Sequence, residues 1–141
     1  MEQTLIINNF ISTQLFGVFS SNGSEGFPES AVVAFSTTES LEIIFFTEES
    51  TRKYKNILKD NKVSFVIGWE KDKFTTVQIE GIATEIDQNE LEVYKRNHAA
   101  KHPHSAKYMD LPEERFIKIK PTWIRYSDLS KDPEEIFEIR F

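Results

Sequence analysis

LEIIFFTEESTRKYKNILK, residues 41–59, joins a predicted strand to a predicted helix. The apolar and aromatic first part is typical of a strand, the polar segment Thr47–Ser50 interrupts it, and a helix continues to Lys59. The helix begins with hydroxyl side chains followed by Arg52 and Lys53. Free N–H groups and the positive end of the helix dipole favour an anion there, and two cations add positive charge. We therefore expect an anion site where this strand meets this helix.

The composition excludes several classes of protein. The 141 residues carry a net charge of −6, which argues against a general nucleic-acid binder. The chain has no cysteine, so disulfides, thiol catalysis and Cys-ligated metals are excluded. No apolar run approaches the ~18 residues of a membrane span, and the N-terminus has no basic region typical of a signal peptide. We expect one domain over residues 1–141, in the cytoplasm.

The first half of the chain, up to and including the strand that begins at Leu41, consists mostly of short predicted strands separated by turns. A turn signal about every ten residues favours antiparallel pairing. The predicted elements are a helix over Thr4–Phe16 and strands over Gly17–Ser21, Ser30–Ser36 and Leu41–Thr47, followed by the helix from Ser50 or Thr51.

Strands also dominate the second half of the chain. Gly81 lies where the apolar alternation of a long strand changes phase, as a bulge or bend requires. The predicted strands are Lys62–Trp69, Phe74–Asp87, Phe116–Pro121, Thr122–Asp128 and Ile136–Phe141, with a kink at Pro121. A helix to Lys101 is expected to begin with a capping box of Asp87 and Glu90. These elements predict a mainly β or α+β fold, a small antiparallel barrel of six to seven strands with about three flanking helices, which the resemblance described below makes a split barrel.

Each predicted helix has an apolar stripe that we expect to be buried. In the first helix this stripe is Leu5, Ile6, Phe10, Ile11 and Leu15. In the helix that follows Thr51 it is Tyr54, Ile57 and Leu58, and in the third helix it includes Leu91 and Tyr94.

Five segments in this order resemble the pyridoxamine 5′-phosphate oxidase-like FMN-binding split barrels. They are SAVVAF, IIFFTEESTRKYKNI, NKVSFVIGW, VQIEGIATEI and FIKIKPTWIRYSD, within residues 16–128. In that family an aromatic residue and a Thr end a strand, and a Ser-Arg-Lys-like run opens the helix that holds the flavin phosphate. The resemblance therefore implies FMN contacts from Phe46, Thr47, Thr51, Arg52 and Lys53.

The resemblance also implies a contact to the flavin ring and a form of assembly. A ring-contacting Gln of the family aligns with Thr76, and Gln78 lies one step along the same strand face. Family members are homodimers with each flavin in a cleft between subunits. We therefore expect a homodimeric, FMN-dependent oxidoreductase with a small-molecule substrate or electron donor, in which the cofactor performs the electron chemistry.

Two departures from the family pattern weigh against vitamin B6 oxidation. The strand that begins with Arg and ends with Lys in the true oxidases has Ser30 and Phe35 here. The C-terminal Arg-x-His stretch of those enzymes has no counterpart in IFEIRF. The alternatives are a barrel that carries haem or the deazaflavin F420, or a binding or stress-related module without turnover.

His98, His102 and His104 raise the question of a metal site. An i, i+4 histidine pair is ligand spacing, but Pro103 breaks the helix and no carboxylate is placed to complete a triad. We expect no metal, and histidines at a solvated helix end. No nucleophile–base constellation is evident, so the catalytic residues are unknown.

Overall fold

A computed structural model describes residues 2–141 of the chain. Eight strands form within this range. They are β1 (Phe16–Asn22), β2 (Pro28–Ala34), β3 (Ser36–Thr37), β4 (Ile43–Glu48), β5 (Lys62–Glu70), β6 (Lys73–Glu85), β7 (Glu114–Asp128) and β8 (Glu135–Arg140).

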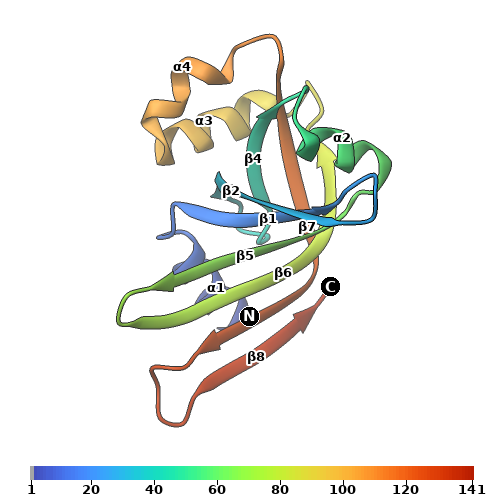
Figure 1. The fold of residues 1–141 in the computed structure, drawn as a ribbon. Coiled ribbons are helices and arrows are strands. Elements are labelled where there is room, and N and C mark those ends of the chain that lie inside the picture. Colours follow the sequence, from blue (N-terminus) through green and yellow to red (C-terminus); the bar gives the residue numbers. More distant parts are fainter. Residues whose placement is uncertain (1) are drawn as a thin grey trace.

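Helices occupy the N-terminus and two connections between strands (Figure 1). They are α1 (Glu2–Ile11), α2 (Arg52–Lys59), α3 (Leu91–Lys101), the 3-10 turn η1 (Pro103–Ser105) and α4 (Ala106–Met109). Figure 1 shows α3 and α4 together beside β4, whereas α1 lies at the opposite side of β5 and β6.

The strands form one antiparallel sheet in the order β2-β1-β5-β6-β7-β4-β3, and β8 pairs with the outer part of β7. The sheet curls into a half-barrel (Figure 1). The predicted split barrel with flanking helices is therefore confirmed. The described residues form eight strands and four α-helices, where six to seven strands and about three helices were expected.

The concave side of the sheet holds the main core. Strand residues at alternate positions point inward, and α1 closes the core with Ile7 and Ile11, both fully buried. Phe19 and Phe45 pack at 4.9 Å and Phe35 and Phe65 at 5.4 Å between ring centroids. Aromatic pairs at these distances stabilise a core beyond the area that they bury.

The predicted irregularity at Gly81 is confirmed. The pairing of β6 with β7 changes register between Glu80 and Gly81, and Gly81 faces Pro121. A side chain at Gly81 would lie 2.6 Å from the carbonyl oxygen of Lys120, so the close approach of the two backbones requires glycine. The two strands predicted on either side of Pro121 form one strand, because β7 runs without interruption past this residue. The register change leaves Thr122 as the extra residue, so the bulge lies in β7, beside Pro121 and at the predicted kink.

The predicted helix stripes are correct only in part. Ile57 is buried, but Leu58 is 66% exposed and Leu5 is 59% exposed. Asn56 takes the buried place expected for an apolar side chain, with 6% exposure. The sheet wraps around one side of each helix, and the exact angle of that contact depends on tertiary packing that periodicity does not specify.

The capping box at the start of α3 does not form. Asp87 Oδ1 accepts a hydrogen bond from the backbone N–H of Asn89 at 3.2 Å, which closes an Asx turn. The helix begins four residues after Asp87, and Glu90 at its N-cap makes no side-chain capping bond.

Two of the three histidines are buried, which corrects the expected solvated helix end for them, whereas His104 is exposed as expected. His98 is fully buried and His102 is 5% exposed. His98 Nδ1 lies 2.9 Å from Ser36 Oγ, and His102 Nε2 donates to the carbonyl of Phe35 at 2.7 Å. Burial, together with the charges of His102 and Lys101, lowers the pKa of His98 to about 4. Both rings therefore fasten α3 to the β2–β3 connection.

Candidate functional site

The hydroxyl groups at the start of α2 form its N-cap. Thr51 Oγ1 donates to the carbonyl of Glu48 at 2.8 Å and accepts from the backbone N–H of Tyr54 at 3.3 Å. Thr47 Oγ1 lies 2.9 Å from Thr51 Oγ1 and is 6% exposed. Because the single hydroxyl hydrogen of Thr51 is already donated to Glu48, Thr47 is the donor to Thr51. Thr51 therefore orients the first turn of α2, and the hydrogen bond from Thr47 holds the Thr51 hydroxyl in place.

Arg52 lies at the first position of α2 and forms an ion pair across to β2. Its Nη1 is 3.2 Å from Glu29 Oε2. Glu29 Oε1 accepts a hydrogen bond from Asn56 Nδ2 at 2.8 Å, and the same amide reaches Ser21 Oγ at 3.1 Å. A buried amide thus holds the Glu29 carboxylate beside the start of the helix.

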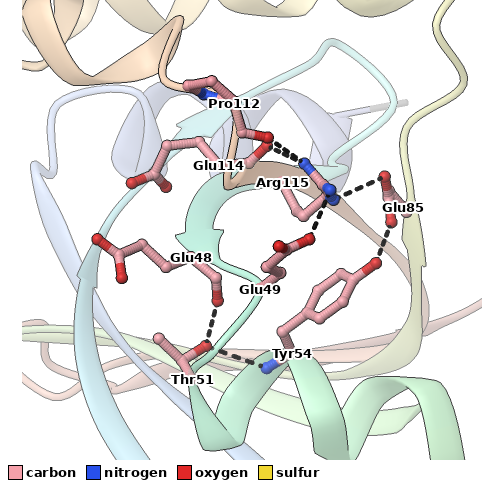
Figure 2. Close-up of polar contacts among 8 residues, drawn as sticks. All are labelled: Glu48, Glu49, Thr51, Tyr54, Glu85, Pro112, Glu114 and Arg115. Carbon is pink, nitrogen blue, oxygen red and sulfur yellow. Dashed lines mark hydrogen bonds and ion pairs between the residues drawn. The ribbon is translucent and has the colours of Figure 1, made fainter.

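The other cations near α2 differ in their surroundings. Lys53 is half-buried and, among residues 2–141, lies within ion-pair distance of no carboxylate. Arg115 on β7 is engaged, because Nη2 is 2.6 Å from Glu49 Oε2 and Nε is 3.8 Å from Glu85 Oε2 (Figure 2). A ligand anion near α2 therefore depends on Arg52 and Lys53.

Carboxylates surround Arg115 on the far side of the α2 N-terminus, as Figure 2 shows. Tyr54 Oη donates to Glu85 Oε1 at 2.5 Å, and this bond raises the pKa of Tyr54. Burial, with the nearby charges of Glu48 and Glu113, raises the pKa of Glu114. The acidic surroundings disfavour an anion on this side of the helix.

Two rows of side chains cross the convex face of the sheet at right angles to the strands. Residues directly opposite each other in antiparallel strands share one face. One row is Val32, Val18, Val66, Gln78, Arg125 and Glu138. The next row is Ser30, Ser20, Ser64, Glu80, Trp123 and Arg140.

Three cavities follow these rows from the start of α2 toward β7. The first, of about 530 Å³, is lined by Glu29, Ser30 and Arg52 among others. It shares Pro28 with a second cavity of about 510 Å³, which includes Lys62. The third, of about 230 Å³, includes Gln78. The second and third share the side chains of the serine row, namely Ser20, Ser64 and Glu80. We call these three cavities the outer trough.

The outer trough brings together only some of the predicted site residues. Arg52 lies at one end and Gln78 at the other. Thr76 lies on the same sheet face as Gln78, two residues further from α2. Phe46 lies elsewhere, beneath α3, where its ring packs on Phe116 at 5.1 Å and on His98 at 5.5 Å. A contact from Phe46 to a cofactor stays a prediction.

Glu29 and Asn56 have no counterpart among the predicted site residues. Asn56 interrupts the apolar face of α2 with an amide, and such a polar residue on a buried face is a signal of a hydrogen-bonded contact. Glu29 follows a turn-rich segment and carries no local signal. Only the pairing of β2 with β1 brings Glu29 opposite Ser21 and within reach of α2.

The residues of the outer trough fit FMN in part. Arg52 and the hydroxyl of Ser30 line one end and offer donors to a phosphate, and the Ser30 hydroxyl also lies 2.7 Å from Ser20 Oγ. The amide of Gln78 offers both a donor and an acceptor at the other end. Phe35 takes the place of the second basic residue of the family strand and is fully buried in the core, so it supplies nothing to a phosphate.

The family follows from the sequence as well as from the fold. The family model described as pyridoxamine 5′-phosphate oxidase matches residues 6–128. The chain belongs to this family of split barrels. A comparison with curated protein sequences finds no match.

Solved structures share the fold at low sequence identity. A Clostridium acetobutylicum protein related to general stress protein 26 of B. subtilis, of the pyridoxinephosphate oxidase family, matches with a TM-score of 0.73 and 16% identity. The match covers 98% of this chain and 95% of that chain.

Two haem-related proteins also have this fold. A heme binding protein from Mycobacterium smegmatis matches with a TM-score of 0.79 and 16% identity, over 93% of this chain and 54% of that one. This chain thus spans about half of that protein. The heme storage protein HutZ from Vibrio cholerae matches with a TM-score of 0.69 and 10% identity, over 83% and 88%.

Proposed function

We propose that the protein binds FMN in the outer trough and acts as an oxidoreductase other than a vitamin B6 oxidase. The observation that carries this proposal is the cavity lined by both Arg52, at the first turn of α2, and Ser30. A helix N-terminus with a cation beside it is suited to a phosphate group. FMN, when bound, would supply hydride or electron transfer.

The residues of this chain would bind and orient the cofactor. Arg52 and Lys53 would neutralise the phosphate, and Thr51 would hold the first turn of α2 in place. Gln78 would hydrogen-bond to the polar edge of the ring system, with Thr76 next to it on the same face. We propose that this site is carried by one domain over residues 1–141 in the cytoplasm. Among residues 2–141 no helix has the length and apolar character needed to cross a bilayer.

A second copy of the chain would complete the site. The convex face carries an apolar patch made of the exposed Val32 and Val66 and the half-buried Val18, and Val18 and Val66 also line the third cavity of the outer trough. Association of two copies through this face would bury the patch and enclose a ligand in the outer trough. We therefore propose a homodimer with the cofactor between subunits.

An FMN titration tests the proposal. We expect flavin fluorescence quenching with the purified protein, and an affinity reduced at least tenfold by Arg52→Ala combined with Lys53→Ala, because two charge-assisted contacts are lost. Lys59→Ala is the matched control, since it removes a cation from the last turn of the same helix and should leave the affinity unchanged. A protein that binds no FMN, or a double variant that binds FMN as tightly as the unmodified chain, contradicts the proposal.

Haem is the second candidate, because two structural relatives carry haem in their names. A haem iron takes an accessible histidine as an axial ligand. His98 has a buried Nε2 without a hydrogen-bond partner, but that ring is closed off by Phe46 and Phe116 and faces none of the trough residues. We therefore favour FMN. A Soret band on haem addition, without flavin binding, would reverse this preference.

A further inference from the structure

We propose that Glu29 competes with the phosphate of the ligand for Arg52 and thereby sets the affinity of the outer trough for phosphorylated ligands. This inference rests on the proposed function, because it assumes that Arg52 receives a phosphate. It adds a specificity-determining residue that lies outside the matched family motifs.

The Glu29 carboxylate is held by a buried partner, whereas the side chain of Arg52 is largely exposed. Both oxygens of Glu29 have partners, Asn56 Nδ2 at 2.8 Å and Arg52 Nη1 at 3.2 Å. Asn56 is 6% exposed and also binds Ser21, so the amide that holds Glu29 cannot turn away without losing two hydrogen bonds. The side chain of Arg52 is 79% exposed, against 21% for Glu29.

The Glu29 carboxylate pairs with the same guanidinium group that would bind an incoming phosphate. Glu29 and Arg52 line the same cavity, and Ser30 follows Glu29 directly along β2. A phosphate bound to Arg52 would therefore lie within a few ångströms of a fixed negative charge. Like charges at that separation repel each other, and the existing ion pair must also be broken.

This competition has a consequence for ligand choice. The phosphate contributes less affinity than two cations and a helix N-terminus would otherwise provide. We expect the ratio of FMN affinity to riboflavin affinity to be smaller in the unmodified protein than in a variant without the Glu29 charge, since riboflavin has the same ring and ribityl chain without the phosphate. The site would then hold FMN as an exchangeable ligand.

The test is Glu29→Gln, titrated with FMN and with riboflavin. Gln has the same shape, and its amide oxygen can still accept the hydrogen bond from Asn56. We expect FMN to bind about threefold to tenfold more tightly, because a fixed charge is removed and Arg52 is released, as judged from the strength of partly exposed ion pairs. The affinity for riboflavin should stay unchanged.

Two further variants separate this mechanism from general charge effects. Glu92→Gln changes the net charge equally, but Glu92 is exposed on α3, lines none of the three cavities and, among residues 2–141, forms no ion pair. It should leave FMN affinity nearly unchanged. In an Arg52→Ala background, Glu29→Gln should lose most of its effect. Thermal unfolding of each variant checks that the fold is retained.

The outcomes distinguish this inference from the proposed function. If the unmodified protein binds FMN and Glu29→Gln does not bind it more tightly, the competition is refuted and FMN binding stands. An equal gain for riboflavin also refutes it, because the effect would then be independent of the phosphate. If neither protein binds FMN, the proposed function fails and this inference fails with it.

Discussion

At the scale of single residues, polar groups inside this protein are positioned by hydrogen bonds that span distant parts of the chain. Asn56 on α2 binds Ser21 and Glu29, and His98 on α3 binds Ser36. A buried polar group without a partner costs free energy, so each contact specifies how its helix docks on the sheet. The buried Nε2 of His98, which lacks a partner, is the exception within residues 2–141.

His98 is expected to make the fold sensitive to acid. Its pKa is lowered from 6.5 to about 4 by burial, followed by the charges of His102 and Lys101. Between these pH values the unfolded chain binds a proton at this position and the folded chain does not. The contribution of His98 to the free energy of unfolding should therefore be constant above about pH 7 and fall by about 3 kcal/mol as the pH drops to 4.

Urea unfolding at several pH values measures this dependence. In His98→Gln the titrating group is absent, so the part of the slope due to this residue should disappear. His104→Gln is the matched control, since His104 is exposed on the neighbouring 3-10 turn. An unchanged pH slope in His98→Gln would show that other groups cause the acid sensitivity.

At the scale of elements, α2 has a start that is specified locally and a docking angle that is not. Thr51 at the N-cap accepts from Tyr54 N and donates to Glu48, which are contacts within a few residues of chain. The face that α2 buries includes Asn56 and excludes Leu58, and this choice depends on the curved sheet. The candidate anion site therefore combines an N-cap specified by neighbouring residues with a helix position specified by long-range contacts.

Removing the N-cap of α2 should weaken the helix. Thr51→Ala deletes the hydroxyl that satisfies the Tyr54 N–H, and we expect a loss of about 1 kcal/mol in the free energy of unfolding. Thr51→Ser retains the hydroxyl and should recover most of this loss. Chemical denaturation without ligand measures both variants. Equal stability of the Ala and Ser variants would mean that the cap does not stabilise the isolated chain.

At the scale of the whole molecule, the convex face of the sheet carries exposed apolar side chains that a second protein chain could cover. Val32 is 69% exposed and Val66 is 37% exposed, and the two lie in one row across three strands. The polar trough runs beside this row. One surface therefore offers both apolar area for association and polar groups for a ligand.

The oligomeric state tests the role of this surface. We expect sedimentation to give about 33 kDa, twice the 16.4 kDa of one chain, and Val32→Glu to shift the mass toward the single chain, because a buried charge without a partner is costly. Val93→Glu, at a position on α3 that is 56% exposed, should leave the mass unchanged. If the unmodified protein sediments as a monomer, the proposed homodimer is refuted.

The sequence by itself determined those features that depend on neighbouring residues. The antiparallel split barrel, the Thr51–Lys59 helix, the irregularity at Gly81 and the family all follow from periodicity, capping residues, turn signals and short motifs. Each of these signals is carried by residues close together in the chain. The wrong expectations, at Leu58, Asp87 and the two buried histidines, concern which side of an element is covered or which of several local contacts forms.

Only the tertiary structure decided what surrounds the candidate anion site. Glu29 lies 23 positions before Arg52 in the chain, and no local pattern links the two. Their ion pair exists because β2 pairs with β1 and α2 docks on β1 through Asn56. Long-range pairing of this kind depends on the packing of the whole sheet, which is why the cations were predictable from sequence and their competitor was not.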